Sequence, residues 1–156
     1  MTTPERIAAF VAEPAVAVVG VSRTGKGFGW LACRELRAKG YRVYPIHPQV
    51  ESIGDVRCYR RIESVPERIN AVLVVVPPEN SLDVVRDAAA AGVRYVWLQQ
   101  GAESPQVITL CHELRLEAIA GACVLMYTKP GGLHRAHRWL HDVFQGASGA
   151  LSASGA

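Results

Sequence analysis

The chain has 156 residues and a net charge of +3; 49% of its residues are hydrophobic and 20% are charged. This length suffices for one domain with a substantial core, and so weak a positive charge does not indicate nucleic-acid binding. No apolar run approaches the roughly 20 residues of a membrane helix, and the N-terminal stretch lacks the apolar region of a signal peptide. We therefore expect a cytoplasmic protein that binds neither nucleic acid nor a membrane.

Five apolar runs, most of them ending at Gly or Pro, are the main pattern along the chain. Runs of this kind are typical of strands that are buried on both faces of a parallel sheet. A segment between the second and third runs, residues 49–60, is irregular or holds a short extra element. The expected strands lie within residues 15–20, 41–48, 69–78, 93–101 and 116–126.

Amphipathic helical patterns separate these runs. The first helix is expected over residues 4–12, before the first strand, with Pro4 in its first turn. Glycines close two of the later helices, and Ser104 caps the start of the last one. These later helices are expected over residues 29–39, 81–91 and 105–114.

Short strand–helix–strand units force parallel strands with right-handed crossovers. We predict an α/β fold: a single doubly wound, mainly parallel five-stranded sheet with helices on both faces, which is Rossmann-like. Such sheets bind ligands beyond the carboxyl ends of their strands. The loops expected to meet there cover residues 20–29, 46–49, 76–80 and 99–104.

The C-terminal part has a different pattern. After a domain over residues 1–128, residues 129–145 predict a helix that packs on it, and residues 146–156 predict a disordered Gly/Ala/Ser tail. Three histidines lie on one face of that helix. We favour an amphipathic docking helix over a metal site, because one short helix rarely completes a tetrahedral set of ligands. These histidines are His134, His137 and His141.

The segment GVSRTGKG, residues 20–27, is one residue short of the P-loop of nucleoside triphosphatases. Gly27 stands where that motif needs a hydroxyl for Mg²⁺, and the third strand ends without an acid. The second strand ends in His47-Pro48, whereas an NAD site needs an acid there for the ribose. NADP is less clearly excluded, because Arg42 and His47 could meet its extra phosphate. No residues for hydride transfer stand out.

The same loop supplies donors and cations that suit a pyrophosphate held without a metal. Gly20 allows a tight exit from the strand, Ser22 offers a hydroxyl, and Arg23 and Lys26 offer positive charge at a helix N-terminus. The alternative is a glycine-rich connection that binds nothing. A ligand is expected to approach the backbone closely at Gly25, Gly27 and Gly29.

Several stretches, in this order, carry a resemblance to one family: VAVVGVSR, KGFGW, LRAKGYRVYPIHPQ, IGDVRCYRRIESVPERINAVLVVVPPE, AAAAGVRYVWLQQGAES and GACVLMY. Together they resemble the small stand-alone CoA-binding domain proteins. These are similar to the CoA-binding Rossmann domain of the succinyl-CoA synthetase alpha subunit and of related acyl-CoA synthetases. The resemblance covers about residues 5–128, and the order and spacing of the stretches are more specific than any single motif.

The resemblance implies that the loop after the first strand holds the CoA pyrophosphate. His47 replaces the usual Asn of an Asn-Pro pair, and Lys26 substitutes for a basic residue usually found one place later. Arg42 is a weaker expected partner of the 3′-phosphate. The full set of expected cofactor-binding residues is Gly20, Val21, Ser22, Arg23, Thr24, Lys26, Phe28, Gly29, Arg42, His47, Pro48, Val76, Pro77, Pro78, Gln99 and Gly101.

The function predicted on this basis is non-catalytic binding of coenzyme A or an acyl-CoA. No nucleophile with a matched base is evident, so we expect no catalytic residues. The alternatives are an NADP-linked oxidoreductase, a subunit of an acyl-CoA ligase, or a regulatory module that senses CoA. The expected partner is the small CoA ligand, and a homodimer or a protein partner stays open.

The four cysteines lack the C-x-x-C spacing of zinc sites and thioredoxin-like motifs. We expect reduced, mostly buried thiols and no metal site. A mixed disulfide between CoA and Cys111 or Cys123 is the alternative to a role in the core. The other two cysteines are Cys33 and Cys58.

Overall fold

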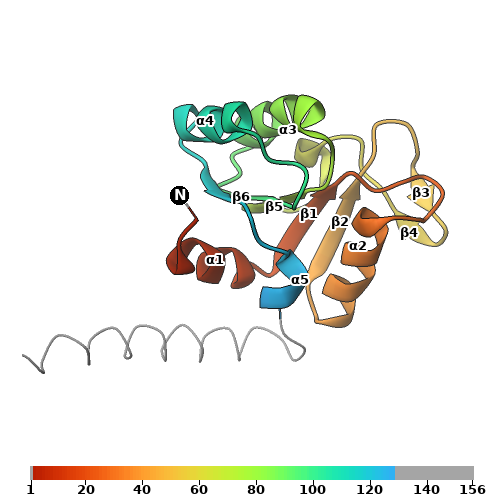
Figure 1. Cartoon of the computed structure of the whole chain (residues 1–156). Coiled ribbons are helices and arrows are strands. Elements are labelled where there is room, and N and C mark those ends of the chain that lie inside the picture. The colour runs from red at the N-terminus through yellow and green to blue at the C-terminus, as the bar shows by residue number, and fades with distance from the viewer. Residues whose placement is uncertain (1, 129–156) are drawn as a thin grey trace, which may run out of the picture.

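The computed structural model of the chain describes residues 2–128. Within them, five parallel strands form one sheet with helices on both faces (Figure 1). The predicted α/β, Rossmann-like fold class is therefore confirmed. The predicted helix over residues 129–145, with its histidines, and the predicted tail over residues 146–156 lie outside the described residues.

The strand order across the sheet is β2-β1-β5-β6-β7. Strand β1 pairs with β2 on one side and with β5 on the other. Strands are therefore added on one side of β1 first and on its other side afterwards, which makes β1 the topological switch point. Ligands of open α/β sheets bind at such a switch point, beyond the carboxyl ends of the strands. The strand bounds are Ala15–Val19 (β1), Arg42–Ile46 (β2), Ala71–Val74 (β5), Tyr95–Leu98 (β6) and Glu117–Ile119 (β7).

The helices form one layer on each side of the sheet. Helices α1, α2 and α5 cover one face, and α3 and α4 cover the other (Figure 1). Consecutive β1 residues alternate between the two buried clusters, which explains why this strand is apolar throughout. The helices are Pro4–Val11 (α1), Phe28–Ala38 (α2), Pro78–Ala90 (α3), Pro105–Glu113 (α4) and Val124–Tyr127 (α5).

The segment left open by the sequence holds a small hairpin. Strands β3 (Ser52–Ile53) and β4 (Val56–Arg57) pair antiparallel beside α2, and a single 3₁₀ turn over Ile62–Ser64 follows (Figure 1). Between them, Tyr59 forms a bridge to Ile46 at the end of β2. The hairpin therefore stands next to the carboxyl edge of the sheet.

Two predicted elements differ from the structure. Helix α3 begins at Pro78 instead of Ser81, because proline has no N–H to leave unpaired in the first turn. The fifth strand ends early at Ile119, a turn follows at Gly121, and the unexpected helix α5 comes after it. Side chains of β6 hold this turn, since Trp97 Nε1 donates a hydrogen bond of 2.9 Å to the Ala122 carbonyl.

Candidate functional site

The loop between β1 and α2 lies at the switch point, and two of its glycines are needed for contact within the protein. A Cβ on Gly20 would lie 2.3 Å from the carbonyl oxygen of Val75, in the loop after β5. A Cβ on Gly29 would lie 2.4 Å from the carbonyl oxygen of Gly20. Gly29 thus lets the first turn of α2 pack against the loop, and the close approach of a ligand at Gly29 stays a prediction.

Of the other two glycines of the loop, only Gly27 faces open space. Gly27 has φ of +87°, and no atom lies within 4 Å of the position of its missing Cβ. It is the N-cap of α2, and no side chain caps the amides of the first turn. These free N–H groups and the helix dipole make a positive end that favours anions. Gly25, with φ of +68°, packs beside Ile53 of the hairpin.

The polar side chains of this loop are ordered by local hydrogen bonds. The Ser22 hydroxyl lies 2.8 Å from the Thr24 hydroxyl and accepts a bond of 3.2 Å from the Thr24 amide. Arg23 and Lys26 are exposed beside them, whereas Val21 is buried in the core. Val21 thus anchors the loop, and the exposed cations and hydroxyls remain available to a ligand.

His47 follows β2 and acts as a turn-forming acceptor. Its Nδ1 accepts hydrogen bonds from the amides of Gln49 (3.0 Å) and Val50 (3.2 Å). An Asn side-chain oxygen commonly makes the same kind of turn, so His47 and the Asn that the resemblance implies at this position are both able to form it. The ring must keep Nδ1 unprotonated for this, which leaves its Nε2 as the site of the proton. Pro48 is exposed next to it.

Residues after β5 and β6 complete this edge. Val76 and Pro77 precede α3, and their carbonyls accept hydrogen bonds from the buried Ser81 hydroxyl (3.3 and 3.2 Å). Pro78 is the first residue of α3. After β6, Gly101 makes the turn with φ of +95°.

Gln99 has a structural role that the sequence did not reveal. Its side chain is 5% exposed, and its Oε1 accepts a hydrogen bond of 3.2 Å from the Val124 amide. This bond joins the end of β6 to the start of α5, across 25 positions of the chain. No pattern in the sequence identifies such a distant partner.

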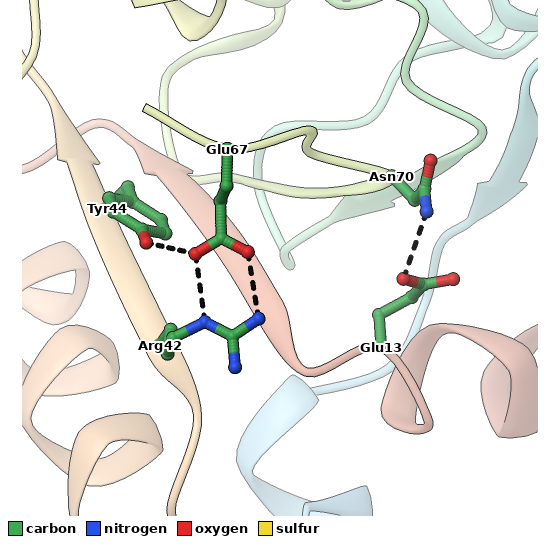
Figure 2. A network of polar contacts seen from close by, with 5 residues as sticks. All are labelled: Glu13, Arg42, Tyr44, Glu67 and Asn70. Atoms are coloured by element: carbon green, nitrogen blue, oxygen red, sulfur yellow. Dashed lines mark hydrogen bonds and ion pairs between the residues drawn. The ribbon is translucent and has the colours of Figure 1, made fainter. Parts of the chain in front are cut away.

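Arg42 is the one expected site residue that the structure separates from the others. It begins β2 and is level with Ala15, so it lies at the amino edge of the sheet. Its guanidinium is held by Glu67 through two bonds of 2.8 Å, and Tyr44 donates a further bond to Glu67 (Figure 2). Arg42 therefore lies at the edge opposite the other expected site residues, because parallel strands start there, and its contact with a 3′-phosphate stays a prediction.

The hydrogen bonds of this network shift the pKa values of Glu67 and Tyr44. The bonds from Arg42 and Tyr44 lower the pKa of Glu67 from 4.5 to about 2. The bond to Glu67 raises the pKa of Tyr44 above its usual value of 10.0. A separate contact near this edge joins Asn70 to Glu13 (Figure 2). These contacts fasten the segment before β5 to the rest of the sheet.

The expected site residues did not include the basic residues beside the end of β2. The Arg57 guanidinium lies 5.2 Å from the centre of the Tyr59 ring, and that ring packs against Tyr44. Tyr59 accepts a hydrogen bond of 2.8 Å from the His47 amide, so the segment runs beside the carboxyl end of β2. The signal in the sequence is the basic run RCYRR, residues 57–61, at the end of the segment left irregular.

A hollow of about 450 Å³ lies beside α2, away from most of the expected site residues. It separates the outer side of α2 from the β3–β4 hairpin. None of the expected cofactor-binding residues lines it, so volume alone does not identify the site. Its lining residues are Trp30, Cys33, Arg34, Glu35, Arg37, Ala38, Asp55 and Val56.

Three of the four cysteines belong to the core. Burial raises the pKa of Cys33 from 9.0 to about 12, with a further contribution from Cys58, and burial raises the pKa of Cys111 to about 11. Burial also raises the pKa of Cys58. Cys123 is half-buried and belongs to neither hydrophobic cluster. The expectation of mostly buried thiols agrees with this arrangement.

Comparison with known sequences identifies the family. The sequence pattern of the CoA binding domain matches residues 14–129. The chain belongs to the CoA binding domain family. The resemblance seen in the sequence is confirmed, and the carboxyl-edge loops of this CoA binding domain all fall within the match. No helix among residues 2–128 has the length and apolar character to cross a membrane.

Curated relatives of this CoA binding domain are much longer proteins. It is 28% identical over 81 residues to acetate–CoA ligase [ADP-forming] II of Archaeoglobus fulgidus, covering 51% of this chain and 12% of the relative. It is 23% identical over 140 residues to the alpha subunit of acetate–CoA ligase [ADP-forming] II of Pyrococcus furiosus, covering 83% and 29%. The matched regions thus span less than a third of either relative.

Solved structures of similar size share the fold. A conserved hypothetical protein from Pyrococcus furiosus has 30% identity and a TM-score of 0.69, covering 74% of this chain and 100% of that one. A hypothetical protein from Pyrococcus horikoshii has 25% identity and a TM-score of 0.73, covering 80% and 89%. The CoA binding domain therefore resembles independent chains as well as parts of ligases.

Proposed function

We propose that this CoA binding domain binds coenzyme A or an acyl-CoA at the carboxyl edge of its sheet, without turning it over. The observation that carries the proposal is the uncapped first turn of α2 at Gly27, which opens onto free space beside two exposed cations. Free amides at a helix N-terminus suit a pyrophosphate. The family to which the chain belongs supplies the class of ligand.

In this proposal the pyrophosphate lies on the loop over residues 20–27 and on the first turn of α2. One hydroxyl of the Ser22–Thr24 pair donates its proton to the other, and the second hydroxyl donates to the oxygens of the pyrophosphate. Arg23 and Lys26 neutralise its charge. No metal is required, since the amides and cations already offset the negative charge. The resemblance assigns the adenosine or pantetheine part to the edge at Val76, Pro77 and Pro78, and further contacts to Phe28, His47, Pro48, Gln99 and Gly101.

The NADP alternative is weaker than CoA binding. One of the two residues offered for its extra phosphate was Arg42, which lies at the opposite edge and is engaged by Glu67. The second candidate is a component of an acyl-CoA ligase, with a partner chain supplying catalysis. It is favoured by the similarity to a ligase alpha subunit, of which this chain matches 29%.

Isothermal titration with CoA, dephospho-CoA, NAD and NADP tests the proposal. We expect CoA to bind most tightly, and Lys26→Ala to weaken its binding about tenfold, the loss of about 1.4 kcal/mol of charge-assisted contact. Arg86→Ala is the matched control, because Arg86 is an exposed cation on α3 that forms an ion pair with Asp83 on the same helix. Absent binding, or equal binding of all four ligands, would overturn the proposal.

A further inference from the structure

The hollow between α2 and the β3–β4 hairpin begins beside the loop over residues 20–27. A Cβ on Gly25, in that loop, would lie 3.9 Å from Nε1 of Trp30 and 3.6 Å from a methyl carbon of Ile53. Trp30 lies in the first turn of α2 and lines the hollow, and Ile53 belongs to the hairpin, which stands beside α2 (Figure 1). The loop, the helix and the hairpin therefore meet at Gly25, at one end of the hollow.

The side chains that line the hollow combine an aromatic ring with unpaired charges. Trp30 is half-buried and packs on the core, so its ring is held in place. Arg34 and Arg37 follow it along the same face of α2. Both are exposed, and neither guanidinium forms an ion pair or a hydrogen bond within residues 2–128, although Asp55 of the hairpin also lines the hollow. The width of the hollow keeps these opposite charges apart and leaves both guanidinium groups open to a ligand.

We propose that this hollow is the pocket for the adenosine 3′-phosphate part of CoA, an inference that rests on the proposed function. The adenine ring stacks on Trp30, and the guanidinium groups of Arg34 and Arg37 bind the 3′-phosphate. The carboxylates of the lining, Glu35 and Asp55, repel a phosphate but accept hydrogen bonds from the amino group of adenine. The lining thus offers one kind of group to each part of this ligand.

The dimensions of α2 and of the hollow agree with this placement. At a rise of about 1.5 Å per residue, Trp30 lies about 4.5 Å and Arg34 about 10.5 Å along the axis from the N-cap Gly27. The 5′- and 3′-phosphates of one nucleotide are roughly 7 Å apart at ordinary bond lengths, and an arginine side chain covers a further ~6 Å. The volume of about 450 Å³ lies within the range of roughly 300–1,000 Å³ of small-molecule sites. A pyrophosphate on the first turn of α2 therefore leaves the 3′-phosphate within reach of Arg34.

This placement assigns the two ends of CoA to opposite sides of β1. The resemblance left the edge at residues 76–78 open to either the adenosine or the pantetheine part. With the adenosine between α2 and the hairpin, on the β2 side of β1, the pantetheine arm runs to residues 76–78, which follow β5 on the other side. The 3′-phosphate then meets cations near the loop that holds the pyrophosphate, whereas Arg42 is engaged by Glu67 at the amino edge.

Isothermal titration of the full chain with CoA and with dephospho-CoA tests the contact to the 3′-phosphate. We expect the wild type to bind CoA at least about tenfold more tightly than dephospho-CoA. Arg34→Gln should weaken CoA binding about tenfold and change dephospho-CoA binding by less than about twofold, because only CoA carries the phosphate that this arginine binds.

Arg60→Gln is the matched control for the loss of a positive charge. Arg60 follows Tyr59, which bridges to the end of β2, and it is exposed near the carboxyl edge. Its guanidinium forms no ion pair or hydrogen bond within the part of the chain that the structure describes. The control variant should leave the binding of both ligands within about twofold of the wild type.

Tryptophan fluorescence tests the stacking on Trp30. Adenine that stacks on an indole ring quenches its emission, so CoA and dephospho-CoA should both quench the wild type. Trp30→Leu keeps an apolar side chain against the core. We expect this variant to lose the quenching and to bind both ligands about tenfold more weakly, since the adenine is common to both.

Four results would overturn the inference. They are equal binding of CoA and dephospho-CoA by the wild type, an effect of Arg34→Gln that is absent or equal for the two ligands, a selective loss of CoA binding in Arg60→Gln, and quenching that persists in Trp30→Leu. Arg34 is exposed, so the comparison of the two ligands on its variant decides the matter even where Trp30→Leu does not fold. CoA binding with any of these results overturns only this inference, whereas no CoA binding by the wild type overturns the proposed function with it.

Discussion

Replacing Gly29 by Ala sets two physical effects against each other. Gly29 is the second residue of α2, where helix propensity alone favours Ala by about 1 kcal/mol. A Cβ there would meet the Gly20 carbonyl oxygen at 2.4 Å, its carbon at 2.9 Å and the Val21 Cα at 3.2 Å. These are backbone atoms, and Gly20 is itself pressed against Val75, so the loop has little room to retreat.

We expect the steric clash to outweigh the gain in helix propensity. Overpacking a tight contact costs about 1–3 kcal/mol, and we expect a net loss of about 2 kcal/mol, or roughly 8 °C in the melting temperature of a domain of this size. The same displacement would move the loop away from the first turn of α2. CoA binding should therefore weaken together with stability.

Urea unfolding followed by circular dichroism measures the effect on stability. The pair Arg34→Ala and Arg34→Gly is the control, because Arg34 is exposed in the middle of the same helix. There the Ala variant should be the more stable by about 1 kcal/mol. A Gly29→Ala protein at least as stable as the wild type would refute the close approach of the loop and α2.

Two further predictions concern stability. Glu67→Gln should cost about 0.5–1 kcal/mol at neutral pH, the range of a largely exposed ion pair. The folded pKa of Glu67 is lowered from 4.5 to about 2, so its contribution is complete above about pH 4.5 and is lost as the pH falls towards 2. Unfolding curves of the two proteins should therefore converge over that range; a constant gap would contradict the pairing with Arg42. His47→Ala should cost about 1 kcal/mol, and His47→Asn should restore most of it by accepting the same amides; equal losses in urea midpoint would exclude this role.

The sequence determined most of the secondary structure of this protein, because the signals are local. The caps at Thr3 and Ser104 accept hydrogen bonds from amides three residues later, and an apolar run identifies a strand buried on both faces. The gathering of the loops at one edge also follows, since parallel strands all end on the same side. Arg42 was included in the expected site although it is the first residue of its strand, and the first residues of parallel strands lie at the opposite edge.

Only the tertiary structure decided what individual site residues contact. Gln99 meets Val124 because β6 and the turn after β7 lie side by side, and Gly29 is confined by Gly20 because α2 packs on the loop that precedes it. The half-buried position of Cys123 likewise depends on how the short α5 packs. Such contacts join atoms that the chain does not keep together, so composition and spacing cannot specify them; they are fixed when the helices pack on the sheet.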